Sequence, residues 1–182
     1  MENNQITSAD HRRGLSPRAA APLIIEWRDE TTPGDIESVR RLCQETMVFS
    51  PDEVMIAAEL VQERLTKGPA SGYHFLFAEI QGRLLGYICF GPIACTLESW
   101  DVFWIVVDQV FRGQGVGGQL LERAEHSIFQ AGGRRVYIET SSRPDYDGAR
   151  AFYLGQGCRP QAVMPDFYAP GDDKVIYLKI LS

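Results

Sequence analysis

The sequence lacks long hydrophobic runs: no stretch approaches the roughly 18 apolar residues that a helix needs to cross a bilayer. Its first residues also lack the charged and then apolar pattern of a secretory signal. Cysteine is scarce, and none of Cys43, Cys89, Cys95 and Cys158 forms a C-x-x-C pair or a zinc-type spacing with a histidine. These absences argue against a membrane protein, a secreted protein and a metal site. We therefore expect a cytoplasmic protein with reduced thiols.

Positive charge is also in short supply. The 182 residues carry 18 Lys and Arg against 24 Asp and Glu, a net charge of −6. A protein that grips nucleic-acid phosphates needs a surplus of Lys and Arg, so the balance argues against that class. The length fits one domain, which buries enough surface to fold without disulfides or a structural metal. We expect a disordered tail over residues 1–22, which have no hydrophobic period, and a single domain over 23–182.

The hydrophobic periods predict alternating strands and helices. Helix signals include a capping box at Ser50 and Glu53 and, before it, an apolar stripe that ends at Met47. The expected strands are 23–27, 73–80, 84–92, 99–107, 136–140, 158–163 and 174–181, and the expected helices are 33–47, 51–67, 115–131 and 147–156. The order β-α-α-β-β-β-α-β-α-β-β predicts an α/β protein whose mixed sheet carries helices on its faces.

The strongest chemical signal is a glycine-rich turn, Val-Asp-Gln-Val-Phe-Arg-Gly-Gln-Gly-Val-Gly-Gly, at residues 107–118. It lies between a predicted strand and an amphipathic helix. Glycines let the backbone approach a ligand closely, and the first helical turn offers unpaired N–H groups at the positive end of the helix dipole. The pattern therefore predicts a phosphate-binding site.

A dinucleotide is one candidate ligand. Gly113, Gly115 and Gly118 satisfy G-x-G-x-x-G, and Glu139 ends the next strand where a ribose-binding acid would lie. However, residues 108–112 separate the strand from the first glycine, and the 64 residues after the motif are too few for a doubly wound sheet. Both observations argue against a dinucleotide fold.

Another family fits better. Val107-x-x-x-x-Arg112-x-x-Gly115-x-Gly117 resembles the acyl-CoA-binding motif of the GNAT superfamily of N-acyltransferases. Downstream, Ala149-x-x-Phe152-Tyr153-x-x-x-Gly157 resembles the late helix of that family, and together the motifs cover about residues 70–160. Three positions depart from the pattern: Tyr146 stands where many members have Asn, Gln109 where Pro is common, and Cys158 where an aromatic is usual.

The resemblance implies a GNAT-like fold, with a central, mostly antiparallel sheet of six to seven strands and about four flanking helices. It also implies acetyl transfer from acetyl-CoA to a primary amine, on a small molecule or a peptide, by direct attack in a ternary complex. The strand before the loop would align the thioester, the loop would hold the pyrophosphate, and the late helix would complete the site. The implied cofactor-binding residues are Ile105, Val106, Val107, Arg112, Gly113, Gln114, Gly115, Val116, Gly117, Gly118, Tyr146 and Tyr153.

The chemistry needs a base, because an ammonium has no lone pair with which to attack. Glu98, Asp101 and Glu139 are the candidates, and Asp101 is favoured because it lies within the apolar strand. A period of two places it on the same face as Phe103 and Ile105. A structural carboxylate is the alternative for Asp101.

The departing thiolate needs an acid. Tyr153 matches the general-acid position of the family, and the alternative is an aromatic side chain packed beside Phe152. The acidic and aromatic segment 165–173 is expected to be a loop, which either attracts a cationic amine or is a solvated surface turn. A non-catalytic acyl-CoA-binding sensor or scaffold module is the alternative function.

Overall fold

The computed structural model describes residues 24–182, so the tail expected at residues 1–22 lies outside the described part. Seven strands form one sheet in the order β1-β2-β3-β4-β5-β7-β6, antiparallel throughout except for the parallel pair β4–β5. The strands are β1 (Glu26–Arg28), β2 (His74–Ile80), β3 (Arg83–Pro92), β4 (Ser99–Val107), β5 (Arg135–Ser141), β6 (Arg159–Ala169) and β7 (Asp172–Ile180). The predicted mixed sheet is confirmed, and its mostly antiparallel order excludes the doubly wound parallel sheet of a dinucleotide fold.

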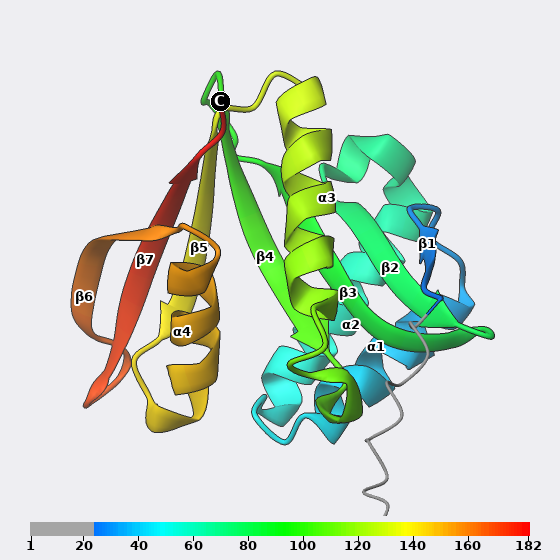
Figure 1. Ribbon diagram of the computed structural model, residues 1–182, viewed down its shortest axis with the longest axis horizontal. Helices are drawn as coiled ribbons and strands as arrows, with labels where there is room; N and C mark the ends of the chain where they lie inside the picture. Colours follow the sequence, from blue (N-terminus) through cyan, green and yellow to red (C-terminus); the bar gives the residue numbers. More distant parts are fainter. Residues whose placement is uncertain (1–23) are drawn as a thin grey trace, which may run out of the picture.

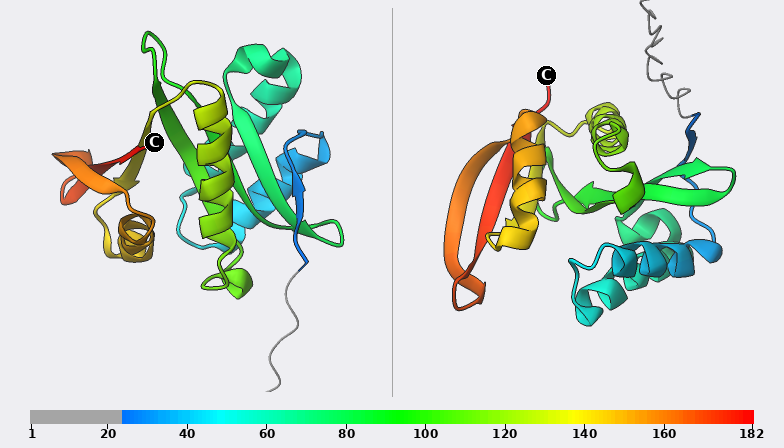
Figure 2. Two further views of the ribbon diagram at one scale, coloured as in Figure 1. Left: turned by 45° about the horizontal axis from the view of Figure 1, so that its top comes forward. Right: turned by 60° about the horizontal axis from the view of Figure 1, so that its bottom comes forward.

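Four helices cover the sheet unevenly. They are α1 (Gly34–Glu45), α2 (Pro51–Lys67), α3 (Val116–Gln130) and α4 (Asp147–Gly155). On one face α3 and α4 pack over a cluster that reaches from β2 to β7. On the other face α1 and α2 pack over a second cluster, which takes its sheet residues from β2, β3 and β4. Figures 1 and 2 show the consequence: β5, β7 and β6 turn away from α1 and α2.

The sheet divides between its two central strands. β4 pairs with β5 only from Ser99 to Val102, opposite Arg135 to Ile138. Beyond Val102 the two strands diverge, as Figure 1 shows for the lower half of β4. The second half of β4 is therefore paired on one side only, with β3.

A bulge in β4 marks the point of division. Phe90 pairs with Val102 and Cys89 with Trp104, so Phe103 has no partner in β3. The extra residue reverses the alternation of side chains along the strand. Trp100, Val102 and Ile105 lie on the α3 face, whereas Trp104 and Val106 lie on the α1 and α2 face.

The prediction that Asp101 and Ile105 share a face is therefore wrong, because a strict period of two fails across the bulge. Asp101 lies between Trp100 and Val102, which both point to α3, and so faces the opposite side with Trp104.

Local signals account for most element boundaries. At the start of α2, Ser50 Oγ accepts from the amide of Glu53 at 3.3 Å, and Glu53 Oε2 accepts from the amide of Ser50 at 2.7 Å. The predicted capping box is thus present. The tight turn between β2 and β3 uses Gln81 and Gly82, both with positive φ (50° and 74°), as a two-residue hairpin requires.

Three local expectations were wrong. Met47 lies beyond the end of α1 and is 86% exposed, so it does not belong to the apolar stripe. β1 begins at Glu26 rather than at residue 23. The segment 165–173 is not a loop, because β6 continues to Ala169 and only a two-residue turn at Pro170 and Gly171 separates it from β7.

In the part of the chain that the structure describes, no helix combines the length and the hydrophobicity needed to span a membrane. Within the same residues, no group of three or more His, Cys, Asp or Glu side chains is arranged to hold a metal ion.

Candidate active site

The glycine-rich turn is fastened to the sheet at its entrance by Asp108. The amide of Asp108 donates to the carbonyl of Leu85 at 2.8 Å, and its buried carboxylate accepts from the amide of Val110 at 2.9 Å and pairs with Arg83 at 2.6 Å. Sequence reasoning missed this residue. An acid directly after a strand is typical of a side chain that caps the following turn, and that signal was available.

Gln109 fastens the same turn from the other side. Its side-chain amide donates to the carbonyls of Glu45 and Thr46, each at 2.9 Å. A proline, common here in GNAT proteins, has no such donor. Together with Asp108, this contact holds the turn between β3 and the end of α1.

The first turn of α3 presents unpaired amides. Gly115 caps the helix with φ at 84°, and the amide of Gln119 donates back to its carbonyl at 3.1 Å. The amides of Val116, Gly117 and Gly118 precede that bond and therefore have no acceptor within the helix. They lie at the positive end of the helix dipole, which suits an anionic ligand.

Arg112 and the residues after it form the outer side of the turn. Arg112, Gly113, Gln114 and Gly115 are all exposed. The Nε of Arg112 donates to the carbonyl of Val107 at 3.3 Å, which brings an exposed guanidinium to the mouth of the turn.

The free edge of β4 adds a second set of donors. The amide of Asp108 donates to the carbonyl of Leu85, and hydrogen-bonded positions alternate along an antiparallel pair of strands. In the register of β4 with β3, the backbone amides and carbonyls of Trp104 and Val106 therefore point toward β3. The amides of Ile105 and Val107 therefore point to the opposite side, where β4 has separated from β5. Of the three strand residues predicted to align a thioester, Ile105 and Val107 have available amides and Val106 does not.

The late helix packs directly against this region. A Cβ at Gly117 would lie 3.4 Å from the ring of Phe152, and one at Gly118 would lie 3.5 Å from the side chain of Gln156. The two sequence motifs are therefore neighbours in space. A Cβ at either glycine would make ordinary van der Waals contact with the late helix or the residue that follows it.

Tyr153 is buried in the cluster shared by α3, α4 and β7. Its ring centroid lies 5.4 Å from that of Phe152 and 5.7 Å from that of Tyr177. Burial raises the pKa of Tyr153 well above its ordinary value, so the phenol is protonated at neutral pH. This is the protonation state that an acid requires, although the packing also fits the structural alternative.

Tyr146 lies at the start of α4 and connects it to α2. Its hydroxyl is 3.4 Å from Glu53 Oε1, and Arg143 stacks over its ring at 5.2 Å. Burial, together with the nearby carboxylate of Glu53, raises the pKa of Tyr146 to about 12.

The three candidate bases occupy different places. Glu98 precedes β4, is 48% exposed and pairs with Arg135 at 2.8 Å. It lies seven residues before Ile105, about 23 Å along a strand. Asp101 and Glu139 lie on the same face of the sheet, since Asp101 pairs with Tyr137 and Glu139 is two residues farther along β5. The structure thus groups Asp101 with Glu139 and separates both from Glu98.

Asp101 has the properties of a base that works near neutral pH. Burial raises its pKa to about 6, the carboxylate of Glu139 adds to this effect, and Lys174 opposes it. Glu139 is itself paired with Lys174 at 2.6 Å. No cation among the described residues lies within ion-pair distance of Asp101.

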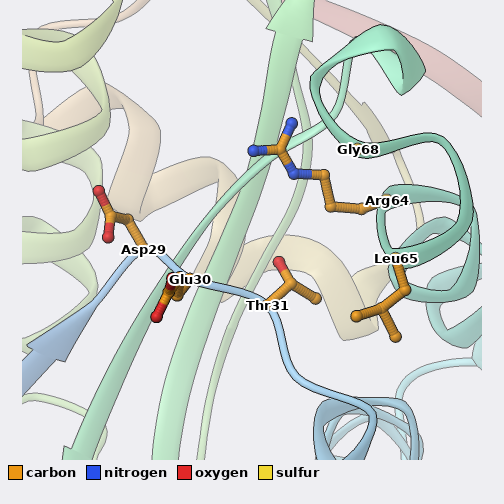
Figure 3. A pocket seen from close by; sticks show the side chains of 6 residues that line it. All are labelled: Asp29, Glu30, Thr31, Arg64, Leu65 and Gly68. Atoms are coloured by element: carbon orange, nitrogen blue, oxygen red, sulfur yellow. The ribbon is translucent and has the colours of Figure 1, made fainter.

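A pocket of about 350 Å³ lies elsewhere, between the β1–α1 connection and the end of α2 (Figure 3). Its lining comprises Asp29, Glu30, Thr31, Arg64, Leu65 and Gly68. None of the predicted site residues belongs to it, and it contains no part of the glycine-rich turn.

Comparisons with known proteins identify the family of this chain. Residues 35–157 match the Acetyltransferase (GNAT) family. The chain is 32% identical over 110 residues to an uncharacterized N-acetyltransferase of Methanocaldococcus jannaschii. That match covers 58% of this chain and 65% of the relative, so it spans less than two thirds of the relative's length.

Solved structures agree. A GNAT-family protein from Desulfovibrio desulfuricans superposes with a TM-score of 0.85 at 38% identity, over 87% of this chain and 99% of that one. An aminoglycoside 6'-N-acetyltransferase in complex with coenzyme A has the same fold, with a TM-score of 0.68 at 18% identity, covering 87% of this chain and 97% of its own. The family match extends over the glycine-rich turn, the split strands and the whole of α4, and this chain is a member of the GNAT acetyltransferase family.

Proposed function

We propose that the protein transfers an acetyl group from acetyl-CoA directly to a primary amine while both substrates are bound. The observation that carries this proposal is the proximity of two sets of amides that have no partner in their own helix or strand, since a Cβ at Gly117 in the first set would lie 3.6 Å from the side chain of Val107 in the second. One set belongs to Val116, Gly117 and Gly118 at the start of α3, and the other to Ile105 and Val107 on the free edge of β4.

The donor fits these groups by chemistry. A pyrophosphate is an anion, and the helix N-terminus supplies amides and a positive dipole end for it, with Arg112 adding charge at the mouth of the turn. An amide-rich acyl carrier can pair with the free strand edge as another strand would. A donor amide from Ile105 or Val107 near the acyl carbonyl stabilises the oxyanion that forms during attack, typically by a few kcal/mol per donor.

The proton movements are assigned to two side chains. Asp101 accepts the proton that the ammonium must lose. Its raised pKa lies closer to a neutral working pH than the pKa of an ordinary carboxylate does. Tyr153 remains protonated and supplies a proton to the departing thiolate. Glu98 has no part in this assignment, because its carboxylate is exposed and engaged with Arg135.

The first test separates binding from catalysis. Acetyl-CoA at 100 times its dissociation constant should stabilise the protein by about 2.7 kcal/mol, a rise in Tm of several degrees. A nicotinamide dinucleotide should cause no rise. Release of free thiol with an amine panel then measures transfer. Acetyl-CoA binding without transfer to any amine would support the non-catalytic module instead.

Replacing Tyr153 by Phe should lower kcat by at least about tenfold and leave the dissociation constant of acetyl-CoA within about twofold, because only the proton donor is removed. Initial rates and a ligand titration measure the two quantities. Tyr177→Phe is the matched control, since it removes a buried hydroxyl from the adjacent ring of the same cluster. Equal rates in the two variants would show that Tyr153 is a packing residue.

A further inference from the structure

Among the residues that the structure describes, no helix covers one face of β5, β7 and β6. The cluster beneath α1 and α2 contains no residue of β5, β6 or β7. Figure 2 shows these strands turning away on the side opposite α3. We call the surface formed there by Asp101, Phe103, Glu139, Lys174 and the Phe167–Tyr168 pair the acceptor face.

A bulge in the β6–β7 hairpin brings aromatic rings to the acceptor face. Between the pairs Met164–Lys174 and Ala169–Asp172, four residues of β6 lie opposite one residue of β7. Asp166 takes a positive φ of 53° within this bulge, and its carboxylate accepts from the amide of Gly171 at 2.7 Å. The chain then places Phe167 against Lys174, whose Nζ lies 3.7 Å from the ring centroid.

Most acids near this face already have partners. Glu139 pairs with Lys174 at 2.6 Å. Asp172 accepts from the hydroxyl of Ser141 and lies 3.6 Å from Arg143. Asp173 accepts from the amide of Asp166 at 2.9 Å.

The acids of the hairpin therefore make hydrogen bonds or ion pairs within the protein. The interpretation that they attract a cationic amine stays a prediction. The aromatic rings of the hairpin already hold a cation of the protein itself, Lys174. The other interpretation, a solvated surface turn, agrees with the exposure of every residue of β6, although Asp172 in β7 is buried.

Glu53 is engaged as well, in the capping box and by the hydroxyl of Tyr146. The bonds to Glu53, Asp166 and Asp173 come from neutral donors, so these three carboxylates keep their charge. Of the two carboxylates that form the acceptor face itself, Glu139 is paired with Lys174, and Asp101 is the one that no described cation neutralises. The rest of the face consists of the Lys174–Glu139 ion pair and three aromatic rings: Phe103 is 39% exposed, and Phe167 and Tyr168 are each 48% exposed. A face with one unpaired carboxylate among aromatic rings matches a ligand with one positive charge and an apolar body.

We infer that the acceptor is a monoamine whose nitrogen is attached to an apolar or aromatic group, and that polycationic amines are rejected. This inference rests on the proposed function and specifies its substrate. A second or third ammonium would meet Lys174 or rings that Lys174 already occupies, and an unpaired charge in a partly desolvated site costs binding energy.

A monoamine of this kind can be a small molecule or the N-terminus of a peptide, and a panel of acceptor amines distinguishes the two. It comprises 2-phenylethylamine, a peptide with N-terminal Phe and no charged side chains, spermidine and kanamycin. We expect kcat/KM to be at least about tenfold higher for one or both apolar monoamines than for the two polycations. Equal or higher values for the polycations would overturn the inference.

Binding of the same four amines to the protein saturated with CoA, measured by calorimetry, gives a readout that does not need catalysis. If transfer fails for every amine but the apolar monoamines still bind more tightly, the proposed function is wrong and the inference about the face stands. If the polycations bind at least as tightly, the inference itself is wrong.

Lys174 provides a sharper test. Lys174→Met releases Glu139 and gives the acceptor face a second free carboxylate, so the spermidine to phenylethylamine ratio of kcat/KM should rise roughly fivefold, the effect of one partly exposed ion pair. Lys179→Met is the matched control. Lys179 lies on the same strand and pairs with Glu125 at 2.7 Å, on the α3 face. An unchanged ratio in Lys174→Met, or the same rise in Lys179→Met, would show that the ion pair of Lys174 and Glu139 does not determine the preference for monoamines.

Discussion

Asp101 shows which properties of a single residue can be predicted from the sequence and which depend on the fold. Its position inside an apolar strand identified it as an unusual carboxylate, and the structure adds the burial and the repulsion from Glu139 that raise its pKa. Its face relative to Ile105 was mispredicted, because the bulge at Phe103 depends on how β3 pairs with β4 and leaves no mark in local sequence. Glu98, by contrast, was already the less favoured candidate in the sequence, and the structure adds its exposure and its ion pair with Arg135.

The assignment of Asp101 as base predicts a specific pH dependence. The base must be deprotonated, so with saturating amine kcat should rise with pH through an apparent pKa of about 6 and then level off. Asp101→Asn should lower kcat by about 10²-fold or more and remove this limb of the profile.

Glu139→Gln serves as the comparison. Loss of the repelling carboxylate leaves Lys174 free to favour the charged form of Asp101, so the limb should move to lower pH. A limb near pH 6 that persists in Asp101→Asn would mean that another group is titrating.

At the scale of elements, sequence signals defined helices better than strands. The capping box fixed the start of α2, and the glycines fixed the start of α3. β6 was cut short at residue 163 because Pro165 and a run of acids resemble a loop. The strand continues because Asp166 and Asp173 close hydrogen bonds across its bulge, a pairing that depends on β7 being alongside.

Two glycines in the turn before α3 should respond differently to the same substitution. Gly115 has φ at 84°, which strains any L-residue, so Gly115→Ala should distort the first turn and raise the dissociation constant of acetyl-CoA by about fivefold or more. Gly118 has ordinary helical geometry, and a Cβ there would meet only the side chain of Gln156 at 3.5 Å.

Gly118→Ala is therefore the matched control, with an expected change of less than about twofold in the same titration. Similar losses in both variants would indicate that crowding against α4, rather than the backbone conformation of the turn, determines affinity.

At the scale of the molecule, the order of elements was predictable and the shape of the sheet was not. Hydrophobic periods gave the succession of strands and helices because each period is local. The division between β4 and β5 results from a bulge and from the way α3 and α4 pack across both halves, while α1 and α2 pack across one. The acceptor face exists because of this unequal covering.

Asp101 should also affect stability. Its pKa is raised from 3.8 to about 6 in the folded protein, so the folded state holds a proton that the unfolded state releases. Its contribution to stability is therefore fully present below pH 3.8 and is lost as pH rises through about 6. At pH 8, Asp101→Asn should raise the free energy of unfolding by about 1 kcal/mol, allowing for partial exposure.

Thermal or urea unfolding at pH 8 and pH 3.5 measures this difference, which should vanish at the lower pH. Asp145→Asn, which removes an exposed carboxylate, should change stability little at either pH. A stabilisation of Asp101→Asn that is the same at both values would contradict the raised pKa.

The free edge of β4 beyond Val102 makes this an unfinished sheet. The amides of Ile105 and Val107 would complete it if β5 approached, and substitutions that drew the strands together would gain hydrogen bonds and stability. On the proposed function, the same bonds are reserved for the acyl donor. Selection for greater stability at this point would then act against catalysis, because pairing of β5 with the free edge of β4 would occupy the amides that the acyl donor needs.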